Sequence, residues 1–111
     1  MSKPNIFNPG FSKYTQITYV GFNVPAGGAG WVDTDVSAVT GTDTHKVWVV
    51  VAFSSITDKN VGIRPHGSAL TPSMWASKST TLLTTVDSTG HADLLRDAAA
   101  SIDYGFIGYF R

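Results

Sequence analysis

The sequence predicts an all-β fold: an antiparallel, jelly-roll-like β-sandwich of about seven to eight strands with an extended N-terminal arm. The first reason is composition. The chain is rich in Thr, Ser, Gly, Val and aromatic residues and has no Glu, so it lacks the usual surface residues of helices. The second is pattern, because short alternating apolar and polar segments recur between turn residues. The 111 residues fit one domain.

Residues 1–13 form the predicted arm, and residues 14–111 form the predicted sandwich domain. The arm shows no period, and its two prolines prevent a helix. It nevertheless carries three apolar side chains, namely Ile6, Phe7 and Phe11. Two interpretations stay open: the arm packs on its own domain, or it docks on a neighbouring subunit or partner.

The first strand is expected over residues 14–24. Its apolar face switches between Tyr19 and Val20, which predicts a β-bulge or a bend between sheets. A glycine-rich loop follows at residues 25–30, and a short half-buried strand begins at Trp31.

The strongest strand is expected over residues 45–56, where both faces are apolar. Strands of this kind are central in a sheet and covered on both sides. A turn follows at residues 57–60. Next, Ile63 is expected to point inward and Arg64 outward, and Pro65 ends the pairing.

Residues 66–79 are expected to form a long connection, with Met74 and Trp75 tucked beneath it. A strand at 80–86 and a turn at 87–90 come next.

Residues 91–101 fit either a strand followed by a loop or a short helix, and we favour the strand. The last strand is expected over residues 102–110, where aromatic and aliphatic side chains alternate with small or polar ones.

Charge and composition argue against several classes of function. The net charge is zero and the basic residues do not cluster, which argues against nucleic-acid binding. The longest apolar run, residues 47–53, is too short to span a membrane. The N-terminal residues lack the apolar stretch of a signal peptide, so we expect synthesis in the cytoplasm. Without Cys there is no disulfide, thiol nucleophile or thiolate metal site.

No motif predicts catalysis, a cofactor or a metal. The segment "PAGGAGW" lacks the Lys of a P-loop and the helix of a dinucleotide fingerprint. The segment starting at Asp33 begins like an EF-hand, but Ala38 and Thr44 stand where Gly and Glu are required. Two interpretations of Asp33, Asp35 and Asp43 stay open: they gather around a cation or, as we favour, they belong to a polar strand edge that caps its own turn. The three histidines are not at metal-ligand spacing, and the sequence offers no nucleophile elbow and no pair of buried acids. We therefore expect a protein that is not an enzyme.

Trp48 lies inside the strongest strand and is predicted to be core. Trp31 and Trp75 are the tryptophans with a chance of exposure, and with His66 they are the candidate ligand contacts. For both tryptophans, packing in the core or at an interface is the favoured interpretation. Arg64 is expected to pair with an Asp, with backbone carbonyls or with a neighbouring subunit.

The order of these features resembles the small β-sandwich domains of tailed-bacteriophage virion proteins, such as capsid decoration, head-fibre and tail proteins. The resemblance covers residues 31–110. Besides a Val-rich central strand, it rests on "WVDTDVS", "VGIRPHGS", "VDSTGHADL" and "YGFIGYF".

The resemblance implies a non-enzymatic, symmetric, trimeric component of a virion, made in the host cytoplasm, and supplies no catalytic residues. We expect a capsid decoration or accessory protein that oligomerises and attaches through its arm to the major capsid protein or other virion proteins. The residues expected to mediate assembly or anchoring are Ile6, Phe7, Phe11, Tyr14 and Arg64. The alternative is a carbohydrate-binding module of a phage tail or fibre that uses Trp31, Trp75 and His66.

Overall fold

The computed structural model describes residues 13–69, 74–76 and 78–111, with only the backbone of residues 74–76. This part of the chain contains nine strands and one short helix. They are β1 (Tyr14–Val24), β2 (Gly30–Asp35), α1 (Ser37–Thr40), β3 (Val47–Ser54), β4 (Lys59–Val61), β5 (Ile63–Pro65), β6 (Met74–Ala76), β7 (Ser79–Thr84), β8 (His91–Arg96) and β9 (Ile102–Phe110).

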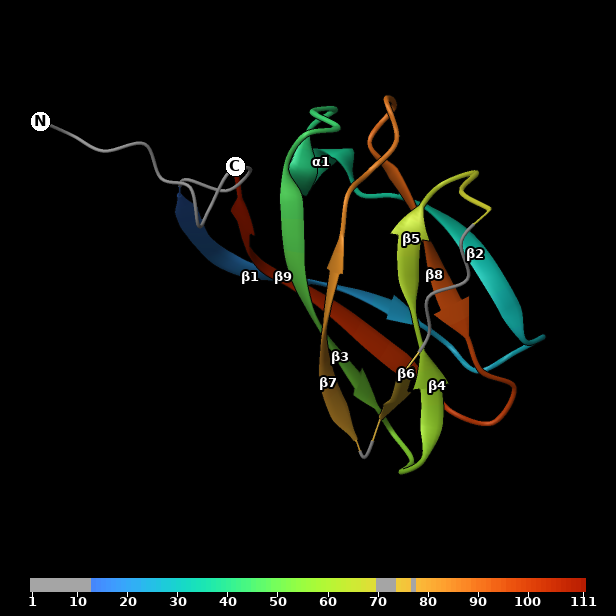
Figure 1. Ribbon diagram of the computed structural model, residues 1–111. Coiled ribbons are helices and arrows are strands. Elements are labelled where there is room, and N and C mark those ends of the chain that lie inside the picture. The colour runs from blue at the N-terminus through green and yellow to red at the C-terminus, as the bar shows by residue number, and fades with distance from the viewer. Residues whose placement is uncertain (1–12, 70–73, 77) are drawn as a thin grey trace, which may run out of the picture.

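The strands form two main antiparallel sheets. One sheet has the order β1-β9-β3-β7, the other has the order β2-β8-β5, and β4 and β6 form a separate two-stranded ribbon. In Figure 1 the strands β2, β8 and β5 make one layer and the longer strands of the first sheet make the other. The predicted antiparallel, β-sandwich-like all-β fold is therefore confirmed, with one or two more strands than expected.

The core lies between the two sheets. From the four-stranded sheet it takes Trp48, which is 1% exposed, with Phe106 and Tyr104; from the three-stranded sheet it takes Ile63 and Leu94. The Trp48 and Phe106 rings meet edge to face, with centroids 5.8 Å apart. The prediction that Trp48 is a core residue is confirmed.

The Tyr104 hydroxyl links the two sheets. It donates a hydrogen bond to the carbonyl of Leu95 at 2.7 Å and accepts one from the N–H of Gly62 at 3.2 Å. Burial raises the pKa of Tyr104 to about 12, against the weaker effect of its backbone hydrogen bonds. The hydroxyl therefore stays protonated and satisfies two backbone groups inside the core.

The details of β1 follow the sequence pattern. Its register against β9 shifts between Gln16 and Val20, at the site of the predicted bulge. The exposed Tyr19 ring lies where a Cβ on Gly105 would stand, 2.0 Å from that Cβ. A side chain at Gly105 on β9 would therefore displace the half-exposed Tyr19 ring from its place.

The segment after residue 90 forms a strand and then a loop, as favoured above. Its first half is β8, and Asp97 then caps the loop by accepting hydrogen bonds from the N–H groups of Ala99 and Ala100. Three expectations are incomplete: α1 was not predicted, β4 includes Lys59 and Asn60 of the turn predicted over residues 57–60, and β6 lies within the predicted connection over residues 66–79. The side chains of Met74 and Trp75 lie outside the described residues.

The prediction that β3 is covered on both sides is wrong for the described part of the chain. β3 lies between β9 and β7, and its residues Trp48, Val50 and Ala52 are buried against the core. On its other face, however, Val49 is only half-buried and Phe53 is 44% exposed. The second apolar face of this strand thus has no covering layer among the described residues.

Candidate functional site

Charged and aromatic side chains gather on the outer face of the three-stranded sheet. Alternation along β2 turns Val32 and Thr34 toward the core and Trp31, Asp33 and Asp35 outward. The register places Asp33 directly opposite Asp93 on β8, and Arg64 on β5 opposite the same Asp93. We call the group formed here by Asp33, Arg64, His66, His91 and Asp93 the Asp–His cluster.

Asp93 is the buried centre of the Asp–His cluster, with 4% of its surface exposed. Its Oδ2 accepts a hydrogen bond from Arg64 Nε at 3.0 Å, and its Oδ1 lies 2.7 Å from His66 Nδ1. Burial opposes ionisation of Asp93, but the hydrogen bonds from His66 and Arg64 outweigh it and hold the pKa of the carboxyl below its usual value. Asp93 is thus an ionised, fully partnered carboxylate.

Asp33 and His91 form the exposed half of the Asp–His cluster. Asp33 Oδ1 lies 2.7 Å from His91 Nδ1 and 3.6 Å from His66 Nδ1. His91 Nε2 lies 3.8 Å from an oxygen of Asp35. The hydrogen bond to Asp93 raises the pKa of His66, and the hydrogen bond to Asp33 raises the pKa of His91; partial desolvation opposes both shifts.

Trp31 packs against the guanidinium group of Arg64, whose Cζ lies 4.2 Å from the ring centroid. This cation–π contact and the ion pair with Asp93 hold Arg64 from two sides. The expectation that Arg64 pairs with an Asp is confirmed.

The structure brings together three residues to which the sequence assigned two different roles. Arg64, expected in assembly, lies with Trp31 and His66, which were the candidate ligand contacts. Tyr14 lies on the other sheet, on β1. The remaining residues of the two sets lie outside the described residues: Ile6, Phe7 and Phe11, and the side chain of Trp75.

Asp33, His91 and Asp93 were not predicted to share a site. No pair of buried acids was expected, because the chain has no Glu and its Asp residues lie near predicted turns. The available signal was the spacing of two residues between His91 and Asp93, which puts both on one face of a strand. The oxygens of Asp33 and Asp93 and a ring nitrogen of His66 lie within 4.8 Å of one another, close enough to hold a metal ion.

The outer face of the four-stranded sheet has the opposite character. Large apolar side chains from all four strands cover it, and several are strongly exposed: Leu83 by 61%, Tyr19 by 50% and Tyr14 by 43%. We call this surface the apolar face; it comprises Tyr14, Tyr19, Val47, Val49, Val51, Phe53, Leu83 and Phe110. Among the described residues alternating onto it, the charged one is Asp103, which accepts a hydrogen bond from Asn23 at 2.6 Å.

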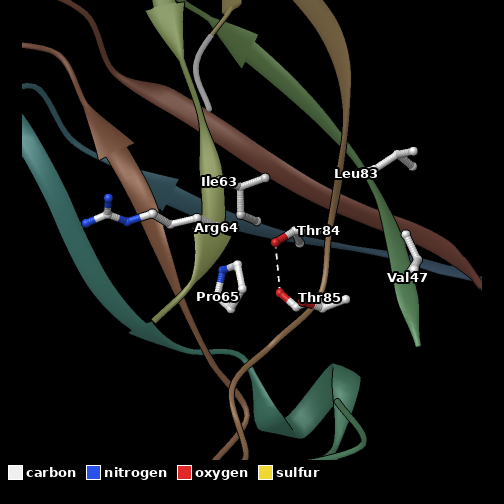
Figure 2. A pocket seen from close by; sticks show the side chains of 7 residues that line it. All are labelled: Val47, Ile63, Arg64, Pro65, Leu83, Thr84 and Thr85. Carbon is white, nitrogen blue, oxygen red and sulfur yellow. Dashed lines mark hydrogen bonds between the residues drawn. The ribbon is translucent and has the colours of Figure 1, made fainter. Parts of the chain in front are cut away.

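An open pocket of about 360 Å³ adjoins the apolar face where β7 approaches β5. Figure 2 shows Ile63, Pro65 and Thr84 around it, with Leu83 and Val47 at its outer side. The Arg64 side chain extends away from the pocket, toward β8 and β2. The pocket is therefore mainly apolar, and Arg64 is the residue that it shares with the Asp–His cluster.

No helix in the described part of the chain is long and apolar enough to cross a membrane. In comparisons with known proteins, no family model, curated protein or solved structure matches the chain.

Proposed function

We propose that this protein is a non-enzymatic structural subunit that self-associates through its apolar face. The observation that carries the proposal is the exposure of large apolar side chains on three of the four strands of one sheet, β1, β3 and β7, with the half-buried Phe110 of β9 beside them. Soluble monomers rarely expose apolar patches larger than a few hundred Å². Four strands spaced about 4.8 Å apart, with about eight residues each rising about 3.3 Å, present a plane of roughly 500 Å².

Burial of this surface supplies the driving force. At roughly 25 cal/mol per Å², a fully apolar plane of this size on each of two partners would offer at most about 25 kcal/mol, against about 4–15 kcal/mol for lost translational and rotational freedom. A standard interface buries about 800 Å² per partner, so the rim of the apolar face must contribute as well. The association is therefore expected to depend strongly on each large side chain in the patch.

A second copy of this chain is the partner that suits the surface. Because the described part of the apolar face is nearly free of charge, two copies meet without like-charge repulsion. The exposed Leu83 lies beside the pocket, so the same surface offers both a protruding side chain and a pocket that a side chain of another copy can fill. A patch that meets its own copy closes a two-fold dimer, whereas the trimer implied by the resemblance, which stays our expectation, needs a head-to-tail contact between Leu83 of one copy and the pocket of the next.

The test is the native mass in solution, measured by light scattering on a sizing column. We expect the light-scattering mass of the wild-type protein to be three times the 11.8 kDa mass of one chain, or the mass of another closed oligomer. Leu83→Lys places a charge in the apolar face and should give monomer. The control is Ile56→Lys, because Ile56 is equally apolar and 43% exposed but lies outside this face. A wild-type monomer at high concentration would overturn the proposal.

The finer part of the proposal is a capsid decoration or accessory protein with jelly-roll connectivity, made in the host cytoplasm and carried on the virion. It is supported by the resemblance and by the apolar side chains Ile6, Phe7 and Phe11 in the arm, residues 1–13. Deletion of residues 2–12 should abolish attachment to particles but leave the sheet structure intact by circular dichroism. Particles that still carry the shortened protein would contradict attachment through the arm.

One observation favours carbohydrate binding as a second candidate function. Trp31, Arg64 and His66 lie together on an exposed sheet face beside Asp33. An aromatic ring next to charged hydrogen-bonding groups suits a sugar, which offers an apolar face and a rim of hydroxyls. A glycan array tests it: saturable binding that is lost in Trp31→Ala supports it, and an array without signal removes it.

A further inference from the structure

We propose that the Asp–His cluster binds one divalent transition-metal ion through Asp33 Oδ1, His66 Nδ1 and Asp93 Oδ1. This inference goes beyond the proposed function and does not depend on it. The ligands come from three separate parts of the chain. Asp33 lies on β2, Asp93 lies on β8, and His66 directly follows β5. The site is thus created by the sheet register and not by a local sequence motif.

The distances suit a small ion. Tetrahedral Zn²⁺ with bonds of about 2.0–2.2 Å holds its ligand atoms about 3.4 Å apart. His66 Nδ1 lies 3.6 Å from Asp33 Oδ1 and 2.7 Å from Asp93 Oδ1. The second pair must open by less than 1 Å when an ion replaces the hydrogen-bonded proton between nitrogen and oxygen, and the oxygens of the third pair, Asp33 and Asp93, lie within 4.8 Å of each other. His66 follows the last residue of β5, so its side chain can adjust without disturbing the sheet.

Neighbouring groups already orient the ligands. Arg64 Nε holds Oδ2 of Asp93, which leaves Oδ1 to face His66. His91 Nδ1 donates to Asp33 Oδ1 and fixes the direction of that carboxylate. Hydrogen bonds of this kind to ligating carboxylates are a regular feature of protein metal sites.

The local charge also favours a dication. The protein has eight acidic residues and no net charge, yet four of the carboxylates lie at this end of the sheet. They belong to Asp33, Asp35, Asp87 and Asp93. Of the basic side chains, Arg64 pairs with this group. With neutral imidazoles the site therefore carries an excess of negative charge, which a divalent ion would offset.

The donor atoms indicate the class of metal. One imidazole nitrogen and two carboxylate oxygens form a mixed set that suits Zn²⁺ and other first-row divalent ions better than Mg²⁺, which prefers oxygen ligands throughout. The Asp33 and His66 side chains are 49% and 43% exposed, so an ion can enter from solvent and keep a water as its fourth ligand.

The test is calorimetric titration of ZnCl₂ into the full, untagged chain after treatment with a chelator. We expect one ion per chain, with an affinity at least about tenfold lower in His66→Ala and in Asp33→Asn. Both residues are exposed, so these variants should keep the wild-type circular dichroism spectrum. The matched control is His45→Ala: His45 lies 3.5 Å from Asp43 and is 89% exposed, forming a surface His–Asp pair outside the cluster.

Each outcome decides the proposal. Saturable binding of one ion per chain that is lost in both cluster variants and kept in His45→Ala supports it. Wild-type protein without saturable binding overturns it. Equal losses in the His45→Ala control, or unchanged affinity in both cluster variants, would mean adventitious surface binding and would overturn it too. Because the stoichiometry is counted per chain, the result is independent of whether the protein is monomeric or assembled.

Discussion

The outer faces of the two sheets are built in the same way, but their side chains find partners on one face and remain exposed to water on the other. Both are formed by side chains that alternate outward from antiparallel strands. On the three-stranded sheet these side chains bond one another, so Asp93 and Arg64 are partnered within the chain. On the four-stranded sheet they are apolar, and Leu83 and Tyr19 are largely in water. One face is completed by its own contacts, whereas the other leaves large apolar side chains uncovered among the described residues.

The largest expected effect tests the outer face of the three-stranded sheet, which carries the Asp–His cluster. Asp93→Asn removes a carboxylate that is 4% exposed and leaves the largely buried Arg64 without its charge partner. Breaking a buried ion pair from one side costs about 3 kcal/mol of unfolding free energy. Urea denaturation followed by circular dichroism measures it. Asp103→Asn on the edge of the apolar face is the control and should change stability by no more than about 0.5 kcal/mol.

A smaller effect is expected where Trp31 covers Arg64. Trp31→Ala removes the cation–π contact and some half-buried apolar surface, and should lower the unfolding free energy by about 1 kcal/mol. The same denaturation experiment applies. If Trp31→Ala is as damaging as Asp93→Asn, Trp31 supports the core more than its half-exposed position indicates.

Because of the histidines, the stability contributed by the Asp–His cluster depends on pH. His66 and His91 have raised pKa values in the folded state, so their stabilising contribution is fully present below the unfolded value of 6.5 and is lost as pH rises through the folded values. Asp35, Asp87 and Asp93 have lowered pKa values, so their contribution is present above the unfolded value of 3.8 and is lost on further acidification.

Stability from this face should therefore be greatest between these two values and decline as pH rises above 6.5. Thermal melting in chelator-containing buffers of constant ionic strength measures the decline. The effect is small because both histidines are exposed and screened by salt. A double variant, His66→Gln with His91→Gln, should flatten the pH profile between pH 6 and pH 8; an unchanged slope would contradict the assignment.

Sequence alone predicted most of the fold, because the patterns it needed are local. The switch of apolar face at Tyr19 and Val20 located the bulge in β1, and the outward direction of Arg64 came from the buried Ile63 beside it. The strand β6 was missed because its three residues carry no alternation long enough to detect.

The Asp–His cluster was not predicted because it depends on which strands are neighbours. Asp33 and Asp93 lie sixty positions apart in the chain and meet only because β2 pairs with β8 in one register. Likewise, the two apolar faces of β3 were predicted correctly from the sequence. An apolar pattern predicts that a face is buried, but it does not identify the surface that covers it. The sequence pattern agrees with an apolar face that a second copy covers.

The smallest effect on intrinsic stability is expected on the apolar face. Leu83 is 61% exposed, so Leu83→Lys should change the unfolding free energy of the dissociated chain by no more than about 0.5 kcal/mol. Its effect should appear instead in the concentration dependence of melting. A self-associating protein gains stability by mass action, so the wild-type melting temperature should rise with protein concentration, whereas that of Leu83→Lys should not. A wild-type melting temperature that is independent of concentration would mean that the apolar face tolerates water, and the contrast between the two faces would then be one of composition alone.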